Sequence, residues 1–234
     1  MKYAEAKISE LYDLSHTEAA PLLEGLTYPW EALPKIKDFI RELGKTLSPE
    51  EYYHPLDDTG AEKEDVWIHK SAVVFKTAYI AGPAIIGPET EVRQCAFIRG
   101  SALVGTHCVV GNSTELKNVI LFDNVQVPHY NYVGDSILGY KSHMGAGSIT
   151  SNVKSDKKLV VVHFSDENVE TGMKKFGAMI GDRVEVGCGS VLNPGTVIGR
   201  NSNIYPLSSV RGAVDSCSIY KKQGEIAGKT EEYL

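Results

Sequence analysis

Large apolar residues recur every six positions along most of this chain. One run comprises Ile68, Val74, Ile80, Ile86, Val92, Ile98, Val104, Val110, Leu116 and Phe122, and a second comprises Ile180, Val186, Leu192, Ile198, Ile204 and Val210. An α-helix favours a period near 3.6 and an alternating strand a period of 2, so neither explains the pattern. A period of six is typical of a parallel β-helix built from hexapeptide repeats.

A second periodicity supports this fold. Four residues after most of the large apolar residues stands a small or β-branched one, as at Ala84, Thr90, Ala102 and Ser190. We expect the large side chain to point inward and the small one to allow a tight corner, with three hexapeptides forming a triangular coil of about 18 residues. Successive coils would stack at roughly 4.8 Å, the ordinary strand spacing.

Composition narrows the possible functions. The chain has 234 residues and a net charge of −6, with no basic stripe, which disfavours nucleic-acid binding. No apolar run is long enough to span a membrane, and the first residues lack the apolar core of a signal peptide. The four cysteines show no CxxC spacing and predict free thiols in a cytoplasmic protein.

The first 65 residues do not carry the repeat, and we expect them to form a helical appendage and linker that caps or flanks the β-helix. Residues 15–18 (Ser-His-Thr-Glu) predict a capping box that begins a helix, and residues 36–44 predict a short amphipathic helix ending at a glycine. The repeats are expected over 66–212, with a one-residue slip after Pro128 and a polar, lysine-rich insertion at 153–179. The tail, 213–234, predicts a strand and a short polar helix.

Two cations and one histidine stand out between residues 99 and 152. Arg99 and Lys117 are 18 residues apart, which places them on neighbouring coils as a possible phosphate clamp; two solvated surface cations are the alternative. His129 lies where the repeat breaks and is a candidate general base. No histidine spacing indicates a catalytic metal.

These residues, with Tyr132-Val133-Gly134-Asp135 and Gly145-Ala146-Gly147-Ser148-Ile149-Thr150-Ser151-Asn152, resemble a known family. They are similar to the acetyltransferase domain of bifunctional N-acetylglucosamine-1-phosphate uridyltransferases and of glucose-1-phosphate thymidylyltransferase-like proteins. The resemblance covers about residues 66–212 and implies a left-handed β-helix. Residues 1–65 contain no GxGTR-type nucleotide loop, so the resemblance does not extend to the nucleotidyltransferase domain.

The resemblance implies acetylation of the amine of a hexosamine 1-phosphate, such as glucosamine or galactosamine 1-phosphate, by acetyl-CoA. His129 would be the general base that accepts the amine proton. Arg99 and Lys117 would hold the phosphate, while Tyr132 and Asn152 would contact the sugar.

The same resemblance implies roles for four further residues. Lys158, in the insertion, would contact the substrate. Ala146, Cys188 and Pro206 would line the groove for acetyl-CoA, the only cofactor expected. Such domains form homotrimers with shared sites.

Three alternatives remain open from the sequence. The acceptor could be another amino sugar, a nucleotide-linked sugar or a hydroxyl group, because one scaffold serves many acceptors. The chain could instead be a non-catalytic trimeric scaffold that regulates a separate nucleotidyltransferase. A carbonic-anhydrase-like metal site would need three histidine ligands across the subunit interface, for which His107, His129 and His143 are candidates.

Overall fold

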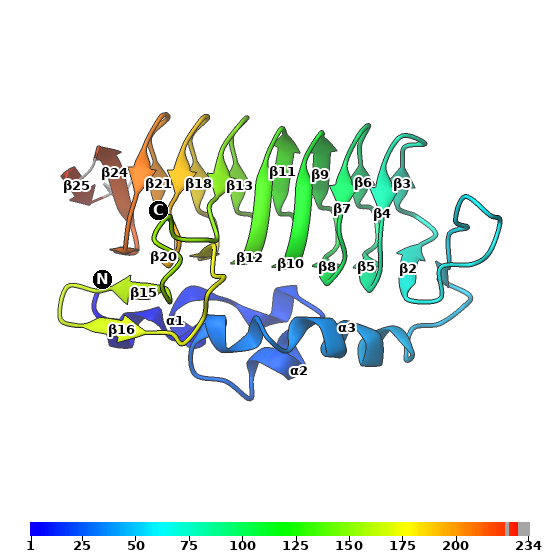
Figure 1. Cartoon of the computed structure of the whole chain (residues 1–234), viewed down its shortest axis with the longest axis horizontal. Coiled ribbons are helices and arrows are strands. Elements are labelled where there is room, and N and C mark those ends of the chain that lie inside the picture. The colour runs from blue at the N-terminus through cyan, green and yellow to red at the C-terminus, as the bar shows by residue number, and fades with distance from the viewer. Residues whose placement is uncertain (223–224, 229–234) are drawn as a thin grey trace.

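The chain folds into a three-sided prism of stacked parallel strands (Figure 1). The computed structural model describes residues 1–222 and 225–228. Strands of successive coils pair in parallel, with registers such as Val92 to Val110 and Ile98 to Leu116. The prediction of a left-handed β-helix is confirmed.

Three faces make up the prism. Face 1 contains β3 (Val73–Val74), β6 (Glu91–Val92), β9 (Val109–Asn112), β11 (Gln126–His129), β13 (His143–Met144), β18 (Glu185–Val186), β21 (Asn203–Ile204) and β24 (Ser218–Lys222). Face 2 contains β4 (Tyr79–Ile80), β7 (Phe97–Ile98), the first halves of β10 (Glu115–Leu121) and β12 (Tyr132–Leu138), β14 (Ile149–Thr150), β19 (Val191–Leu192) and β22 (Ser209–Val210). Face 3 contains β2 (Val66–His69), β5 (Ala84–Ile86), β8 (Ala102–Val104), the second halves of β10 and β12, β17 (Ala178–Ile180), β20 (Thr196–Ile198) and β23 (Ala213–Val214).

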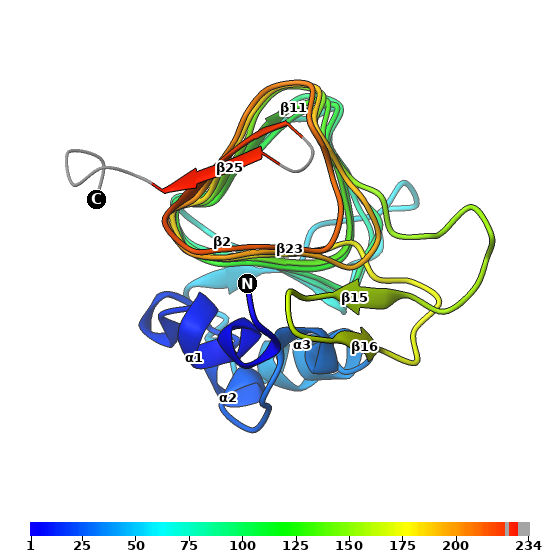
Figure 2. The same cartoon turned by 90° about the vertical axis from the view of Figure 1, so that its left-hand side faces the viewer.

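The three corners of the prism have different neighbours (Figure 2). Corner A joins faces 1 and 2 and lies at the top of that view, farthest from the helices. Corner B joins faces 2 and 3 and lies beside the insertion. Corner C joins faces 3 and 1 and lies beside α1 (Ile8–Leu11).

The interior is filled as the repeat predicts. Apart from the partly buried Val74 near one end, its large apolar residues are fully or nearly fully buried, and so are small residues such as Thr90 and Thr114. These two hydroxyls donate to carbonyls of adjacent coils, Gly105 O at 2.7 Å and Val127 O at 2.9 Å. These two buried hydroxyls are therefore paired, as burial requires.

The structure has two slips where the sequence predicted one. The step between inward residues shortens at corner B from Val133 to Leu138, after Pro128 as predicted, and also one coil earlier, from Leu116 to Leu121, which the sequence analysis missed. The corner residues there, Asn118 and Asp135, turn the chain with positive φ values of 55° and 48°. Because the corner is one residue tighter, β10 and β12 run continuously across it.

Short helices cover face 3. They are α1, α2 (Ala20–Leu23) and α3 (Ile36–Gly44), with 3-10 turns at Tyr3–Ala6, Leu14–His16 and Pro29–Ala32. The helix at 36–44 was predicted, but the capping box was not found: Asp13 caps a 3-10 turn by accepting a hydrogen bond from Ser15 N at 3.1 Å. The segment flanks the prism along its length, although the division of the chain at residue 65 stays a prediction.

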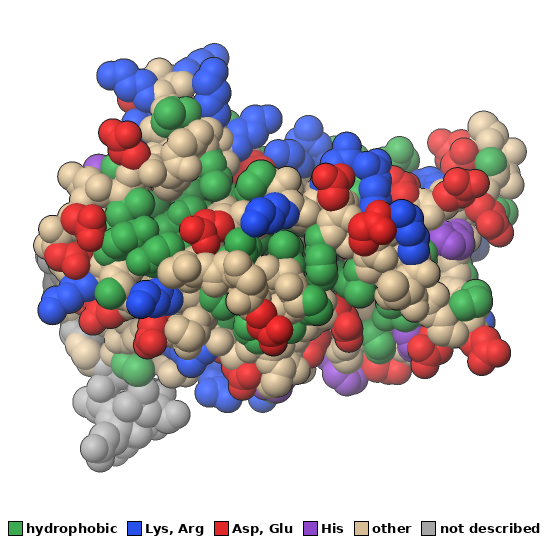
Figure 3. All heavy atoms as spheres, turned by 90° about the horizontal axis from the view of Figure 1, so that it is seen from below, with side chains coloured by type: hydrophobic (Ala, Val, Ile, Leu, Met, Phe, Trp, Pro, Cys, Tyr) green, Lys and Arg blue, Asp and Glu red, His purple; other side chains and the backbone are tan. Residues whose placement is uncertain are grey.

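The strands of face 3 are apolar on both sides because of this layer. One outward side chain per coil is buried beneath the helices: Trp67, Ile85, Leu103, Ile120, Ile137, Met179 and Val197. Gly44 shows how close α3 approaches, since a Cβ there would lie 2.5 Å from the Trp67 ring. Seen from below, the outer surface of the layer has hydrophobic areas among scattered charges, and Lys and Arg side chains gather along the edge beside the insertion (Figure 3).

The insertion leaves the prism at corner B and folds against the start of the chain. Its hairpin, β15 (Val161–His163) and β16 (Asn168–Glu170), is antiparallel. Phe164 packs 5.3 Å from the ring of Tyr3, and Ser165 N donates to Met1 O at 3.0 Å. The predicted insertion is therefore partly anchored rather than fully free.

The two ends of the prism carry antiparallel strands. β1 (Tyr52–Tyr53) pairs with β2, and β25 (Glu225–Gly228) pairs with β24. The tail therefore forms a hairpin up to residue 228 instead of the predicted helix; residues 223–224 and 229–234 lie outside the described part. No helix within the described residues is long and apolar enough to cross a membrane.

Candidate functional site

Four of the predicted site residues stack at corner A, one on each of four successive coils. Gly147 N donates to His129 O at 3.0 Å, Gly189 N to Ala146 O at 2.9 Å, and Leu207 N to Cys188 O at 2.9 Å. These bonds place Ala146 next to His129, then Cys188, and then Pro206. All four side chains are exposed. The predicted base and the predicted cofactor residues thus share one edge of the prism.

A buried asparagine fixes the backbone around His129. Asn131 is 2% exposed; its Oδ1 accepts from His129 N at 3.1 Å, and its Nδ2 donates to Gly145 O at 2.8 Å and to Ser148 O at 3.1 Å. Asn131 therefore links the turn after β11 to the turn after β13. The imidazole of His129 itself meets no hydrogen-bond partner within residues 1–222 and 225–228, which leaves it open to a ligand.

A groove of about 550 Å³ runs down face 1 beside this edge. It is lined by His143, Gly145, Glu185, Val186, Gly187, Cys188, Asn203, Ile204, Tyr205, Pro206 and Ile219. Gly187 in its lining leaves no room for a side chain, because a Cβ there would lie 2.4 Å from Pro206 N of the next coil. Two of the three predicted cofactor residues, Cys188 and Pro206, line the groove, and Ala146 directly follows the lining residue Gly145. Along the wall, His143 Nδ1 lies 2.8 Å from Glu185 Oε2.

Across face 2, at corner B, a cluster of polar residues surrounds the carboxylate of Asp135. The cluster consists of Lys117, Asn118, Tyr132 and Asn152. Asp135 accepts from Lys117 Nζ at 2.9 Å, from Asn118 Nδ2 at 2.9 Å and from Asn152 Nδ2 at 2.5 Å. Asn152 Nδ2 also donates to Tyr132 Oη at 3.1 Å. Burial, followed by the negative charge of Asp135, raises the pKa of Tyr132, so its hydroxyl keeps its proton. Hydrogen bonds thus bring together Lys117, Tyr132 and Asn152, three of the residues expected to contact the substrate, around an aspartate to which the sequence analysis assigned no role.

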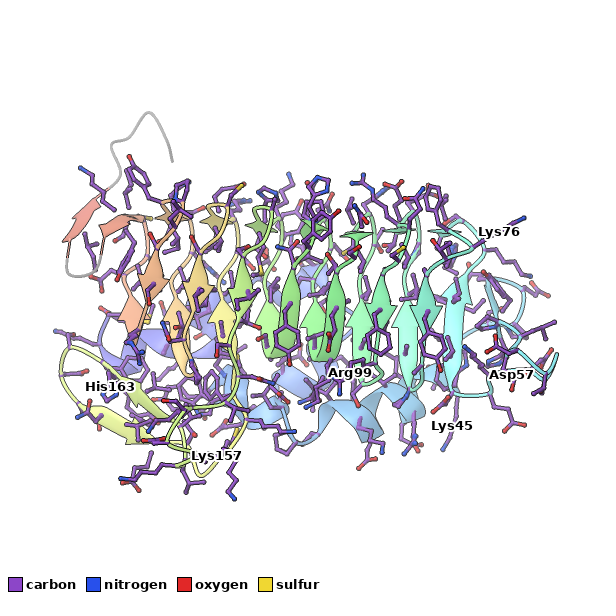
Figure 4. The ribbon with its side chains drawn as sticks, turned by 45° about the horizontal axis from the view of Figure 1, so that its top comes forward. Lys45, Asp57, Lys76, Arg99, Lys157 and His163 are labelled. Atoms are coloured by element: carbon purple, nitrogen blue, oxygen red, sulfur yellow. The ribbon has the colours of Figure 1, made fainter. Side chains whose placement is uncertain are left out.

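Arg99 lies in register with Lys117 on the coil before it, since Arg99 N donates to Leu116 O. Its guanidinium donates to Glu115 Oε1 at 2.7 Å, which raises the Arg99 pKa further. Figure 4 shows Arg99 at the edge of the prism that borders the helices. Each stacked cation therefore already has a carboxylate partner, and a phosphate would have to compete with it.

Lys158 is the predicted residue that the chain does not bring to this cluster. It is exposed in the insertion loop, where its backbone N–H donates to Asp156 Oδ1 at 3.0 Å. Figure 4 shows the neighbouring Lys157 pointing away from the prism. The loop does contribute to a polar cavity of about 410 Å³, which includes Lys154, His163 and Arg211.

Sequence reasoning missed Asn118, Asn131 and Asp135. The signal for two of them was present: Asn118, Asp135 and Asn152 recur at intervals of 17, and they stack at corner B once its shorter turns are known. The alignment of these three residues is hidden when every coil is expected to have 18 residues.

The histidines of the metal-site alternative lie apart. His129 is at corner A, His143 is on face 1, and His107 is a positive-φ residue beside corner C. Within the described part of this single chain, no three His, Cys, Asp or Glu side chains form a group that could hold a metal ion.

Comparison with known proteins gives consistent relatives. A family model described as the GMPPB C-terminal domain matches residues 80–170. The chain is 30% identical over 220 residues to the bifunctional protein GlmU of Methanococcus maripaludis strain C5, covering 94% of this chain and 52% of that protein. It is 30% identical over 166 residues to a bifunctional sugar-1-phosphate nucleotidylyltransferase/acetyltransferase of Sulfurisphaera tokodaii, covering 71% and 41%. The resemblance expected from the sequence is confirmed, and the chain spans about half the length of the curated relatives it matches.

Solved structures resemble the chain more distantly. The polySia-specific acetyltransferase NeuO has a TM-score of 0.47 at 11% identity, covering 75% of this chain and 84% of that one. A mutant of perosamine N-acetyltransferase from Caulobacter crescentus, in complex with CoA and GDP-perosamine, has a TM-score of 0.35 at 16% identity, covering 70% and 56%.

Proposed function

We propose that this chain is an acetyl-CoA-dependent N-acetyltransferase that acts on a hexosamine 1-phosphate. The observation that carries the proposal is the position of His129. It lies at corner A between the groove of face 1 and the polar cluster of face 2. The name of one relative, a bifunctional sugar-1-phosphate nucleotidylyltransferase/acetyltransferase, supports the same reading.

Acetyl-CoA would occupy the groove, with its thioester beside Ala146. The acceptor would lie across face 2, with its phosphate toward Arg99 and Lys117 and its amine toward His129. From His129 to Asp135 the chain advances six residues, at most about 20 Å when extended, and the side chains reach inward from both edges. A sugar phosphate laid across the face could therefore contact both ends.

In the proposed reaction the amine nitrogen attacks the thioester carbonyl. The N–C bond forms, His129 accepts a proton from the amine, the C–S bond breaks, and that proton passes to the departing CoA thiolate. The N–H of Ala146 meets no acceptor within residues 1–222 and 225–228, and it lies beside His129 where a developing oxyanion could be stabilised.

We further propose that the chain acts as a homotrimer in which Lys158 of the exposed loop reaches the site of a neighbouring copy. Its separation from the polar cluster within one chain supports this arrangement. Light scattering of the full chain measures the assembly directly; a stable monomer with full activity would contradict it.

The first experiment is to incubate the full chain with acetyl-CoA and a panel of sugar 1-phosphates, including glucosamine and galactosamine 1-phosphate, and to follow CoA release. We expect release that requires an amino sugar and falls about 10²–10⁴-fold in kcat in His129→Ala, the usual contribution of a general base. If none of the acceptors in the panel causes CoA release, the proposal is rejected.

A scaffold without activity remains the second candidate. The observation that favours it is that both cations of the predicted clamp already have carboxylate partners. In that case the folded native chain would neither release CoA nor bind a sugar phosphate in calorimetry.

A further inference from the structure

The carboxylate of Asp135 is the centre of the polar cluster at corner B. Its side chain is only 5% exposed, although it is charged. Oδ1 accepts from Lys117 and Asn118, while Oδ2 accepts from Lys117 at 3.2 Å and from Asn152. A carboxylate offers about four lone-pair sites, so these bonds use its full capacity. Asp135 is therefore unable to accept a hydrogen bond from a ligand as well.

These bonds also determine how Asn152 can meet a ligand. An ionised carboxylate cannot donate, so the amide of Asn152 must turn its NH₂ group toward Asp135. The two hydrogens of that group are used by Asp135 Oδ2 and by Tyr132 Oη. The carbonyl Oδ1 of Asn152 is then the only polar atom of its side chain left for a ligand, and it can only accept.

The same bonds orient Tyr132. Because its oxygen accepts from Asn152, its hydroxyl hydrogen is free to point elsewhere and donate. Gly134 makes room for this arrangement, since a Cβ there would lie 2.5 Å from Tyr132 Oη and 3.0 Å from Asn152 Nδ2. One acceptor and one donor are thus presented side by side above Gly134.

We propose that Asp135 is a positioning residue of the acceptor site: it holds Asn152 so that its carbonyl oxygen meets a hydrogen-bond donor, an amino or hydroxyl group, of the acceptor. Asp135 also holds the Lys117 ammonium through both of its oxygens. The inference rests on the proposed acetyl transfer, and it selects acceptors that carry a donor at this point over analogues in which that group is absent or is only an acceptor.

Replacing Asp135 with Asn tests this role. The amide of Asp135→Asn can accept through one oxygen only, and its own NH₂ would face the NH₂ of Asn152. Asn152 then turns over and presents a donor where the acceptor molecule also has a donor. We expect the KM for the amino-sugar phosphate to rise at least tenfold, because a mismatched buried polar pair loses a full hydrogen bond. The KM for acetyl-CoA should change less than twofold, since its groove lies beyond corner A.

Asp182→Asn is the matched control. Asp182 is another carboxylate with an 8% exposed side chain, at corner C, where it accepts from Tyr140 N at 2.9 Å and Asp13 N at 2.7 Å. If Asp135 were merely structural, both variants would lower stability and leave the KM for the acceptor unchanged. An unchanged acceptor KM in Asp135→Asn, or an equal rise in both KM values, overturns the proposal.

If Asp135→Asn does not fold, Asn118→Ser removes one of the bonds to Asp135 and leaves its ion pair intact. We expect a smaller rise in the acceptor KM, about two- to fivefold, and no change in that variant would count against the role.

If the native chain releases no CoA with any acceptor, the acetyl transfer fails, and calorimetry with glucosamine 1-phosphate alone decides the inference. Binding that weakens at least tenfold in Asp135→Asn would keep the positioning role, whereas absence of binding to the native chain would reject it.

Discussion

The outward side chain of Ile120 tests whether the helical layer and the prism form one cooperative unit. Ile120 lies in the second half of β10, with Leu103 on the coil before it and Ile137 on the coil after it. The three side chains are at most 2% exposed, although they point away from the prism interior. α3 contacts β8 and β10, which carry Leu103 and Ile120, and the 3-10 turn at Pro29–Ala32 contacts β12, which carries Ile137.

The cost of Ile120→Ala follows from this environment. Full burial of an isoleucine side chain contributes about 1.5–3 kcal/mol. Its neighbours belong to a rigid strand stack and cannot collapse fully into the space, so a cavity term adds to the loss. We expect the free energy of unfolding to fall by about 3–4 kcal/mol, within the usual range of about 2–5 kcal/mol for such truncations.

Urea denaturation of the two proteins at equal concentration measures the difference through the midpoint and the slope. Val73→Ala is the control: Val73 points outward from face 1 and is 55% exposed, so it should change stability by about 0.5 kcal/mol or less. A loss for Ile120→Ala no larger than that of the control would show that the helical layer is only loosely attached.

Three further predictions concern the polar cluster at corner B and the buried carboxylate of Asp182. Lys117→Met should raise the KM for the phosphorylated acceptor more than it lowers kcat, because a phosphate clamp acts mainly through binding; steady-state kinetics at varied acceptor concentration measures both. Gly134→Ala should also raise that KM, since its Cβ would displace the Tyr132 hydroxyl, and an unchanged KM would contradict the predicted geometry. Burial raises the pKa of Asp182 above its unfolded value near 3.8, so the folded state holds its proton more tightly. The native chain should therefore gain stability relative to Asp182→Asn as pH falls from 7 through the raised pKa toward 4. Urea denaturation of both proteins at the two pH values measures this. An equal difference between their midpoints at both pH values would refute it.

The hexapeptide pattern was sufficient for the prism because one inward residue in six determines both the strand and the coil. It was not sufficient for the helical layer. The signal was a third hexapeptide in each coil that is apolar at its outward position as well, as in Ala84-Ile85-Ile86 and Ala102-Leu103-Val104. Strands buried on both faces read as continuous apolar runs. Such runs predict a cover for that face, and the helices and turns within residues 1–44 supply it.

The candidate site was predictable to the extent that it depends on stacking. The sequence placed Arg99 beside Lys117 from an interval of 18, and the structure has them in register. It missed Asp135 because a turn shortened by one residue changes the interval to 17. That turn is also what puts a carboxylate at the corner: with a single positive-φ residue making the bend, its side chain meets the asparagines of both adjacent coils. The departures from the repeat at corner B, two tight turns and then the insertion, are therefore what gather a carboxylate, two asparagines and a lysine at one edge of an otherwise uniform prism.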